Sequence, residues 1–418
     1  MHKRILTYIA LAGTSLQAMA EARFPKPDFT SGYEYPEILH GMPFEQLWNV
    51  VDIVLLIGMM CLVTWAAYKK RSRKVIYSTS IISVLYFGFF RSGCICSVGS
   101  IQNVVLALTD STYHLPWFVA LLFLVPIIFA LLFGRVFCAG VCPLGAIQEL
   151  VNVRNFRISR AVSSALSIIP WMYLAFTILY AATRSQFLIC RFDPFIGIFR
   201  LGGDMGMIIF GIATLLLSTV VGRPFCQFLC PYGALLSVFS SLSWKKLEIT
   251  NQKCINCALC SKSCPVDAIR TPQSNKNTDT KGIRRVILLA ILLPFFTLAG
   301  GMLVGENSDA LSRAHKDVYL YDLLIEQQNN PEFEETIEVE TFHAMGRKIE
   351  DLQVQVEDIQ KDFKVWSWIA GALIGFVIGF KLLKLSLKRR RRTYEILNAH
   401  CTMCGKCFNY CPQNLKKI

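Results

Sequence analysis

The sequence predicts an all-α polytopic membrane protein with about seven transmembrane helices and an internal repeat, joined to a small cytoplasmic module rich in cysteine. Three observations predict this class. The 418 residues are 53% hydrophobic and only 17% charged, with a mean hydropathy of +0.43. Seven stretches are apolar enough to cross a hydrocarbon core of about 30 Å, which takes roughly 20 helical residues. Most of the 16 cysteines fall in a few regularly spaced motifs.

The N-terminus predicts a secretory signal peptide over residues 1–20. Lys3 and Arg4 precede an apolar run that ends in Ala18-Met19-Ala20, and these are the three sections of such a signal. Cleavage would leave Glu21 on the exported side. An uncleaved signal anchor is the alternative, although the apolar run is short for a membrane span.

The predicted spans set the topology of the chain in the membrane. They cover residues 49–68, 75–91, 115–134, 161–183, 205–222, 286–305 and 365–385. The second and fifth are near the short limit, so they require tilt or local thinning of the bilayer. If the chain starts outside, its strongly basic loops, such as Lys69 to Lys74 and Arg389 to Arg392, fall on the cytoplasmic side, as the positive-inside rule requires. The net charge of +14 therefore reflects topology rather than binding of nucleic acid.

Two copies of one cysteine pattern lie in the cytoplasmic segments 245–280 and 389–418. A C-x2-C-x2-C run wraps three thiolates around one iron–sulfur cubane, while a fourth Cys followed by Pro ligates the other cluster of a two-cluster module. This rule predicts two [4Fe-4S] clusters, one held by Cys254, Cys257, Cys260 and Cys411, and one held by Cys401, Cys404, Cys407 and Cys264. Structural zinc and disulfides are the alternatives, but zinc is usually bound by two separated C-x2-C pairs.

A transmembrane hairpin splits this ferredoxin-like 2[4Fe-4S] module in the sequence. Between Cys264 and Cys401 the chain crosses outward over 286–305, forms an exported acidic segment over 306–364 and returns over 365–385. Both motifs therefore lie in the cytoplasm, where the two halves can meet. Motifs that each pair with another subunit are the alternative.

The exported segment is predicted to be helical. Apolar residues recur there at steps of three and four, which is typical of an amphipathic helix that leads into the last span; they are Ile349, Leu352, Val356, Ile359 and Phe363. The segment is a solvated helical stalk, a short coiled coil or a surface on which a partner docks. Its two histidines, His315 and His343, are expected to be solvated. It contains no C-x-x-C-H, so no c-type haem is expected.

A second group of cysteines forms an internal repeat within the transmembrane core, residues 45–240. The segments 134–146 and 222–234 share the pattern GRxFCxxxCPxGA, and each follows an outward-to-inward span. Such parallel repeats are related by an axis along the membrane normal. Their four thiolates, those of Cys138, Cys142, Cys226 and Cys230, would make an additional sulfur site suited to iron–sulfur or zinc chemistry.

Weaker echoes of this repeat lie at the exported ends of the alternate spans. The stretch 96–102 aligns with 142–148, and Cys190 occupies the corresponding place in the second half. Cys94, Cys96 and Cys190 are either ligands of a redox centre near the outer boundary, or two of them form a disulfide in an oxidising compartment and one thiol is left over. Three cysteines do not complete a four-thiolate site without another ligand.

With both patterns the chain resembles the NosR/NapH family of polyferredoxin-like membrane proteins, which are accessory to nitrous oxide and periplasmic nitrate reductases. The resemblance covers roughly residues 45–270 and the C-terminal motif, including the four CxxxCP cysteines and the eight ferredoxin-type cysteines. It implies a multi-pass electron-transfer subunit of the bacterial inner membrane, which passes electrons from the quinone pool or a cytoplasmic donor to an exported redox protein or cytochrome.

Two departures from this family bear on cofactors and partner. The chain lacks the S-G-A-T-like run of the NosR flavin domain, so no flavin is expected. Unlike the shorter NapH-type proteins, it inserts a long exported hairpin between its two cluster motifs, which leaves the partner open.

Distance is the physical problem for such a protein, because two cytoplasmic clusters cannot pass electrons across about 30 Å of hydrocarbon unaided. We hypothesise a path from the paired clusters through the CxxxCP site to a centre near Cys94, Cys96 and Cys190, with a quinone between the spans as a further candidate; the direction is not readable. The alternative is a maturation factor that reduces or delivers copper for an exported or membrane metalloenzyme, since thiolates favour Cu(I). An ion pump has little support, because Asp52, the one conspicuous charge within a span, is expected to be an interfacial carboxylate.

Overall fold

A computed structural model describes most of the chain. It covers residues 44–93, 97–154, 156, 158–249, 254–272, 280–330, 336–386 and 393–415. The predicted signal peptide, Cys94, Cys96 and the basic run from Arg389 to Arg392 lie outside these residues. The chain divides into two units, residues 1–47 and 48–418, and the second unit holds every element below except the start of the first helix.

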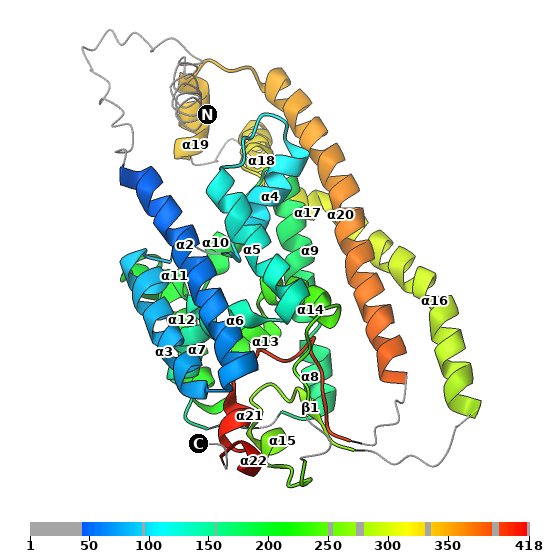
Figure 1. Cartoon of the computed structure of the whole chain (residues 1–418). Coiled ribbons are helices and arrows are strands. Elements are labelled where there is room, and N and C mark those ends of the chain that lie inside the picture. The colour runs from blue at the N-terminus through cyan, green and yellow to red at the C-terminus, as the bar shows by residue number, and fades with distance from the viewer. Residues whose placement is uncertain are drawn as a thin grey trace, which may run out of the picture. The chain divides into compact units, whose positions relative to one another are not determined.

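The first half of the chain is helical throughout its regular structure, as its apolar composition predicts (Figure 1). Its elements are α2 (Phe44–Trp65), η1 (Ala66–Lys70), α3 (Arg73–Ser83), η2 (Val84–Phe90), α4 (Ser100–Thr109), α5 (Trp117–Phe133), α6 (Val136–Gly140), α7 (Pro143–Leu150), α8 (Arg160–Leu166), α9 (Ile169–Ala182), α10 (Leu188–Phe192), α11 (Ile196–Arg200), α12 (Met205–Val220), α13 (Pro224–Phe228) and α14 (Pro231–Ser241). The π-helical turns η1 and η2 continue α2 and α3.

The second half adds a small two-stranded sheet to further helices. Its elements are α15 (Leu259–Ser263), β1 (Ile269–Arg270), α16 (Thr280–Gly305), α17 (Ser308–Ser312), α18 (Lys316–Asn329), α19 (Ile337–Ala344), α20 (Ile349–Ser386), β2 (Glu395–Ile396), α21 (Lys406–Asn409) and α22 (Pro412–Leu415). The two strands frame the long hairpin of α16 and α20 in the sequence.

All seven predicted spans coincide with helices, although they differ in length. Four helical stretches in the described part of the chain are long and apolar enough to cross a membrane: Leu47–Lys70, Ala161–Ala182, Arg284–Gly305 and Ile349–Ser386. α5 and α12 are shorter, at 17 and 16 residues, and the second predicted span is divided between α3 and η2. α5 ends at Gly134, whose φ of +81° leaves the helical region. The structure therefore supports a membrane protein with several apolar helices, while the number seven stays a prediction.

The two copies of the internal repeat have the same order of helices, and helices of each copy pack on helices of the other. In each copy a long apolar helix, α5 or α12, precedes a short helix, α6 or α13, that holds the first cysteine. The second cysteine is the N-cap of α7 or α14, and a proline follows at the first helical position, where its fixed φ suits the helix. α14 packs on α5, and α12 packs on α7. This reciprocal packing agrees with a two-fold relation between the copies.

Asp52 is buried within the helix pair of the first two spans. Its side chain is 3% exposed and pairs with Arg91 Nη2 at 2.8 Å, and Tyr86 Oη donates to Asp52 Oδ1 at 2.9 Å. The expectation of a simple interfacial carboxylate missed this ion pair. The pair satisfies the charge of Asp52 within the protein, as buried charges require.

α16 and α20 form a hairpin in which their backbones approach closely. A Cβ atom added to Gly300 would lie 2.9 Å from Gly375 Cα, and one added to Gly375 would lie 3.3 Å from Gly300 Cα. Small residues at such crossings allow helices to pack tightly in a membrane. The glycines therefore explain why these two helices can pack along each other (Figure 1).

The segment between these helices is a small packed unit rather than a solvated stalk. Its apolar core comprises Val318, Leu324, Val339, Phe342, Leu352 and Val356. α20 continues from this core into the last predicted span without a break, as the amphipathic pattern predicts. His315 is not solvated, since its side chain is 13% exposed and its Nδ1 accepts from the Asp317 N–H at 3.2 Å at the start of α18. His343 is exposed, as expected.

The two halves of the cysteine-rich module lie together although the hairpin separates them in sequence. β1 pairs with β2 in antiparallel register, with Ile269 opposite Ile396. Leu397 N–H also donates to Ala268 O at 2.9 Å, and α15 packs on α21. The sheet therefore joins the segment that follows the first motif to the segment that precedes the second.

Candidate functional site

The eight ferredoxin-type cysteines form two neighbouring groups. Burial raises the pKa of Cys260, and the nearby thiols of Cys254, Cys257 and Cys411 raise it further. Cys407 interacts with Cys401, Cys404 and Cys264, and also with Cys260 of the first group. In both groups the fourth cysteine thus comes from the other motif. The structure brings together the two sets of four that the spacing rule assigned to separate clusters.

The second group is the more deeply seated of the two. Burial, and then Cys404 and Cys264, raise the pKa of Cys401 to about 12, while the Met403 N–H opposes this by donating to the thiol. Met403 is 5% exposed and belongs to the main apolar core. Cys257 of the first group, by contrast, is exposed. The first group therefore faces solvent, and the second lies against the helices of the membrane core.

The four CxxxCP cysteines form a third group inside the core. Burial first, and then Cys226, Cys138 and Cys230, raise the pKa of Cys142 well above its usual value. Cys138, Cys142 and Cys230 are buried, and Cys226 is partly buried. Thiols from both repeats thus converge, as the internal repeat predicts.

A glycine three residues after each second cysteine supports this convergence. Gly233 N–H donates to Cys230 Sγ at 3.2 Å, and Gly145 occupies the equivalent position after Cys142. A Cβ atom on Gly145 would lie 3.4 Å from Cys226 Sγ and 3.6 Å from Cys138 O. The xGA part of the repeat therefore leaves room for the opposite loop and supplies a donor to a thiolate.

A buried glutamine contacts a cysteine at both the CxxxCP site and its outer echo. Gln148 donates to Cys226 Sγ at 3.4 Å and accepts from the Phe225 N–H at 3.0 Å. Gln102 donates to Cys190 Sγ at 3.4 Å and accepts at 2.8 Å from the N–H of Ile189, the residue before Cys190. The alignment of 96–102 with 142–148 thus corresponds to a repeated contact. Cys94 and Cys96 lie outside the described residues, so of the three outer cysteines only Cys190 is placed.

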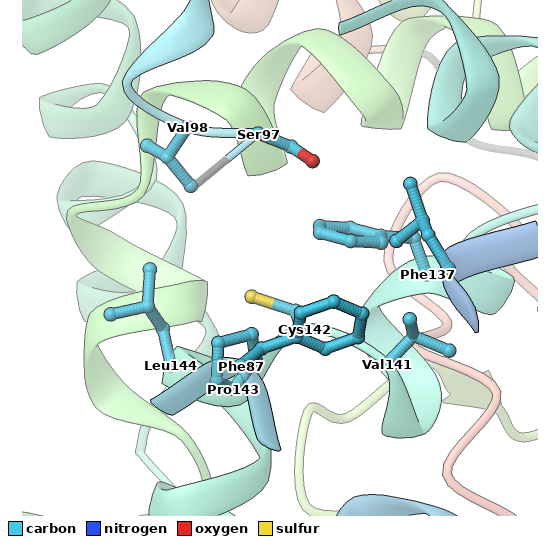
Figure 2. Close-up of a pocket in the computed structure, with 9 residues that line it drawn as sticks. Phe87, Ser97, Val98, Phe137, Val141, Cys142, Pro143 and Leu144 are labelled. Carbon is cyan, nitrogen blue, oxygen red and sulfur yellow. The ribbon is translucent and has the colours of Figure 1, made fainter. Parts of the chain in front are cut away.

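A small cavity separates the CxxxCP site from the outer segment. It measures about 10 Å³ and is lined by Cys142, Pro143 and Leu144 on one side and by Ser97 and Val98 on another. Figure 2 shows the Cys142 thiol directed into this space, with Ser97 and Val98 across it. Under the alignment Ser97 and Val98 are the equivalents of Pro143 and Leu144, so the inner and outer copies of the motif face each other.

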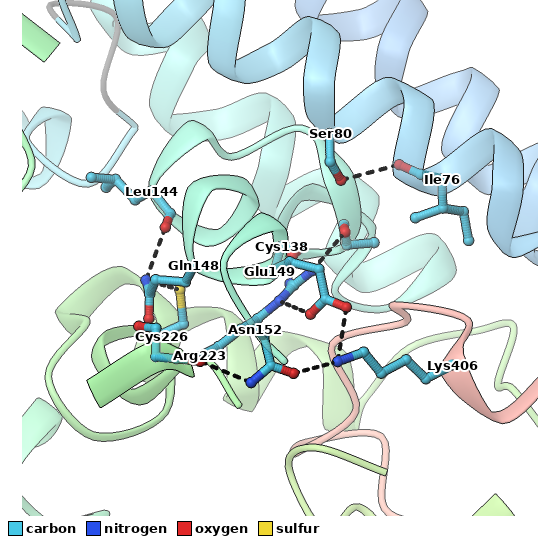
Figure 3. Close-up of polar contacts among 12 residues, drawn as sticks. Ile76, Ser80, Cys138, Leu144, Gln148, Glu149, Asn152, Arg223, Cys226 and Lys406 are labelled. Atoms are coloured by element: carbon cyan, nitrogen blue, oxygen red, sulfur yellow. Dashed lines mark hydrogen bonds and ion pairs between the residues drawn. The ribbon is translucent and has the colours of Figure 1, made fainter. Parts of the chain in front are cut away.

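A buried carboxylate links the CxxxCP loops to the C-terminal motif. Glu149 at the end of α7 binds Arg73 Nη2 at 2.9 Å, Arg223 Nε at 3.1 Å and Lys406 Nζ at 3.1 Å. Figure 3 shows Glu149 between Arg223 and Lys406, with Asn152 completing the contact to Lys406 at 2.7 Å. Burial alone would raise the pKa of Glu149, but Arg223, Lys406 and Arg73 outweigh it and hold the pKa below its usual value.

The GR arginine of each repeat reaches the cysteines. Arg223 donates to Cys138 O and, at 3.0 Å, to Ala139 O. Arg135 Nη2 lies 3.8 Å from Cys138 Sγ, and its Nη1 donates to Ala399 O at 3.3 Å beside the C-terminal motif. Both arginines are therefore within reach of the sulfur site and the ferredoxin module.

The donor chemistry of these three groups fits iron–sulfur clusters. Soft thiolates in sets of four are the ligands of cubanes, and among the described cysteines these twelve are not joined in disulfides. Two buried donors beside the groups, Arg135 Nε and Thr402 Oγ1, have no hydrogen-bond partner in the described part of the protein; each could donate to an anionic cluster. No three His, Cys, Asp or Glu side chains among the described residues gather closely enough to hold a single metal ion.

Sequence reasoning missed the residues around the thiols. Arg135, Arg223 and Gln148 lie within or beside the quoted repeats but were given no role. Glu149 and Lys406 carry no periodic or spacing signal, since their partners come from distant parts of the chain. The repeated IQ at 101–102 and 147–148 was the one sequence signal that could have identified the glutamines.

Two family models for a 4Fe-4S binding domain match the chain. One matches residues 115–161 and again 204–250, so it covers both CxxxCP repeats. The other matches residues 247–270, which include the first ferredoxin-type motif. The matched segments thus contain eight of the twelve cysteines in the three groups.

Several curated proteins are similar to this chain. The uncharacterized protein MJ0750 of Methanocaldococcus jannaschii is 30% identical over 191 residues, which is 44% of this chain and 77% of that protein. The ferredoxin-type protein NapH of Escherichia coli is 31% identical over 162 residues, covering 36% of this chain and 55% of NapH. The regulatory protein NosR of Pseudomonas aeruginosa is 29% identical over 156 residues, covering 33% of this chain and 21% of NosR. The chain thus spans about half of NapH and a fifth of NosR. No solved structure matches the chain.

Proposed function

Because the chain belongs to the family of NosR/NapH-type ferredoxin-like membrane proteins, we propose that it is a membrane-bound iron–sulfur protein that carries electrons between the cytoplasmic side and an exported redox partner. The observation that carries this proposal is the succession of three four-thiol groups. Each group adjoins the next, because Cys407 interacts with Cys260 and Arg223 interacts with both Cys404 and Cys226.

The proposed ligands follow from the grouping. One [4Fe-4S] cluster would be held by Cys254, Cys257, Cys260 and Cys411, and a second by Cys401, Cys404, Cys407 and Cys264. A third centre would be held by Cys138, Cys142, Cys226 and Cys230, and the 4Fe-4S family match over both repeats supports the same cluster type there. When bound, these clusters supply one-electron chemistry, while the protein sets their spacing, charge and exposure.

The order of the centres follows from burial. The first group contains the exposed Cys257, so it is the point of contact for a soluble cytoplasmic partner. The second group lies against the core, where Met403 packs under it, so it connects the first group to the CxxxCP loops. We assign the second group as the required intermediate between the cytoplasm and the membrane site.

The outer part of the path is proposed from the repeated motif. The cavity between Cys142 and the pair Ser97 and Val98 separates the CxxxCP site from the segment that carries the outer cysteines. A centre or disulfide near Cys190, or a quinone between the helices, would complete transfer to an exported protein or to the quinone pool. The acidic unit over 306–364 would lie on the exported side and both cysteine motifs on the cytoplasmic side of the inner membrane, as the basic loops favour.

Electron transfer across proteoliposomes tests the function. The membrane-loop variant Cys142→Ser/Cys230→Ser is compared with wild type for reduction of an external acceptor by an internal donor, and with Ser237→Ala as a control substitution outside the three groups. We expect the cysteine variant to lose at least nine-tenths of the rate through the protein. An unchanged rate would show that the CxxxCP site is not on the path.

Metal analysis of the same preparations tests the copper alternative. Iron in the purified protein at several atoms per chain, with copper absent, is the expected outcome. Stoichiometric copper that disappears in Cys142→Ser/Cys230→Ser would instead assign these loops to copper handling, for which thiolates are also suitable.

A further inference from the structure

The charges around Glu149 do not balance within the quartet that they form. Arg73, Arg223 and Lys406 all bind this one carboxylate, and the side chains of Glu149, Arg223 and Lys406 are 4%, 1% and 8% exposed. The quartet has two net positive charges, and because only Arg73 is partly exposed, at 19%, at least one of them is held away from water. An uncompensated buried charge is strongly unfavourable, so nearby anions are required.

The cysteines of the proposed clusters are the groups that would supply this negative charge. Arg223 interacts with the charges of Cys404, Cys226 and Cys138 as well as with Glu149. Cys404 belongs to the C-terminal motif, whereas Cys138 and Cys226 belong to the two CxxxCP loops. One guanidinium thus lies between two of the three centres. Neutral thiols would leave its field uncompensated, whereas thiolates bound to a cluster would not.

Arg223 is held at this point by more than its charge. Its Nε binds Glu149, and its two terminal nitrogens bind the carbonyls of Cys138 and Ala139 from the other repeat. Its backbone has φ 53° and ψ 57°, a left-handed conformation that side-chain-bearing residues rarely adopt. Arg135, the equivalent in the first repeat, has φ −74°. The second repeat thus departs from the first at the residue that lies between the centres, and such strain is retained where the surroundings fix it.

We infer that Arg223 is a positioning residue that raises the reduction potentials of two centres together, the CxxxCP site and the site of the C-terminal motif. An added electron makes a thiolate cluster more negative. A fixed cation beside it in a low-dielectric setting stabilises that reduced state, and net charge and hydrogen bonding are established determinants of such potentials. No cysteine of the exposed first group is among the strongest charge partners of Arg223, so that group should not share the effect.

This inference rests on the proposed function, and EPR-monitored redox titration of the anaerobically purified full chain tests it. Arg223→Gln removes the cation, Arg223→Lys retains it, and Arg73→Gln is the matched control. Arg73 binds the same Glu149 oxygen as Lys406, but its side chain is 19% exposed, so water screens its charge. Signals are assigned by their loss in Cys138→Ser/Cys226→Ser and in Cys404→Ser.

For Arg223→Gln we expect the ratio of reduced to oxidised centre at a fixed potential to fall at least tenfold at both sites, which for a one-electron couple is about 59 mV. The first group should be unchanged, and Arg73→Gln and Arg223→Lys should stay within threefold of wild type. If Arg223→Gln does not retain its full iron content, the test uses Arg223→Lys. A tenfold change in the ratio of reduced to oxidised centre in that variant would contradict the inference.

Other outcomes distinguish a failure of this inference from a failure of the proposed function. Unshifted potentials in an Arg223→Gln protein with full iron, or equal shifts in Arg73→Gln, would overturn the role of Arg223 alone. Wild-type protein without a signal assigned to the CxxxCP cysteines would overturn the proposed third centre itself.

Discussion

Lys406, which lies between Cys404 and Cys407, binds Glu149 Oε1 at 3.1 Å, and the two side chains are 8% and 4% exposed. A cation of the C-terminal motif is therefore buried against a carboxylate at the end of α7. Because α7 begins with the second cysteine of a CxxxCP loop, this ion pair connects two of the candidate centres through one short helix.

Replacement of Lys406 should loosen the C-terminal motif. In Lys406→Met, Glu149 keeps its ion pairs with Arg73 and Arg223 but loses one charged hydrogen bond, worth about 1.5–3 kcal/mol. We expect hydrogen–deuterium exchange over residues 393–415 of the intact protein to rise by roughly tenfold or more. Lys262→Met, at an exposed position of the first motif, is the control. Equal protection in both variants would show that the pair does not hold the motif in place.

Replacement of Glu149 should be more damaging. Glu149→Gln leaves three cations without their shared carboxylate, and breaking a buried ion pair in this way costs about 3–5 kcal/mol. The yield of folded, monodisperse protein should fall sharply, whereas Glu248→Gln at an exposed site should behave as wild type. Normal yield and thermal stability of Glu149→Gln would rule out a structural requirement for the quartet.

Gly222 should not tolerate a side chain. A Cβ atom there would lie 3.1 Å from Pro265 O and 3.2 Å from Pro265 Cα, and Pro265 follows a cysteine of the second group. Because these are backbone atoms, Gly222→Ala should overpack the contact at a cost of about 1–3 kcal/mol and lower the thermal midpoint by a few degrees. Gly58→Ala, which would meet nothing within 4 Å, is the matched control, and equal midpoints would contradict the contact.

The helical unit of residues 306–364 should weaken in mild acid. Burial, together with Arg184, lowers the pKa of His315 although Asp317 opposes them. A histidine with a lowered folded pKa is fully stabilising above its unfolded value of about 6.5, and this stabilisation is lost as the pH falls from there towards the folded value. Protonation would also remove the Nδ1 acceptor that caps α18.

Amide exchange in the first turn of α18, corrected for its intrinsic pH dependence, checks this expectation. Exchange should rise between about pH 7.5 and 5.5 in wild type. In His315→Asn, which keeps a good helix cap that does not titrate, the rise should be absent. The same pH dependence in both proteins would exclude His315 as the cause.

The sequence predicts the parts of this protein that follow from spacing and periodicity. Apolar length predicts the helices, and the Cys-Pro that ends each motif predicts which thiol crosses to the other group. The amphipathic pattern over 349–363 predicts the start of α20. The CxxxCP repeat likewise predicts that Cys138 and Cys226 converge, because equivalent loops follow equivalent helices.

The charged contacts could not be predicted in this way. In the sequence Asp52 is an isolated carboxylate within a predicted span, because its partner, Arg91, lies at the end of the next predicted span. Glu149, Arg223 and Lys406 come from three separate parts of the chain, and no sequence period relates them. Such pairs depend on tertiary packing, which brings the hairpin's two flanking motifs back to the same surface of the core.

Iron quantification combined with EPR on anaerobically purified protein distinguishes three clusters from two, with wild type compared to Cys138→Ser/Cys226→Ser. Three cubanes in wild type correspond to about twelve iron atoms per chain, four for each cluster. We expect the variant to retain about eight iron atoms, four for each remaining cluster, and to lose one EPR signal. About eight iron atoms in both proteins, with identical spectra, would contradict the proposed centre at the CxxxCP loops.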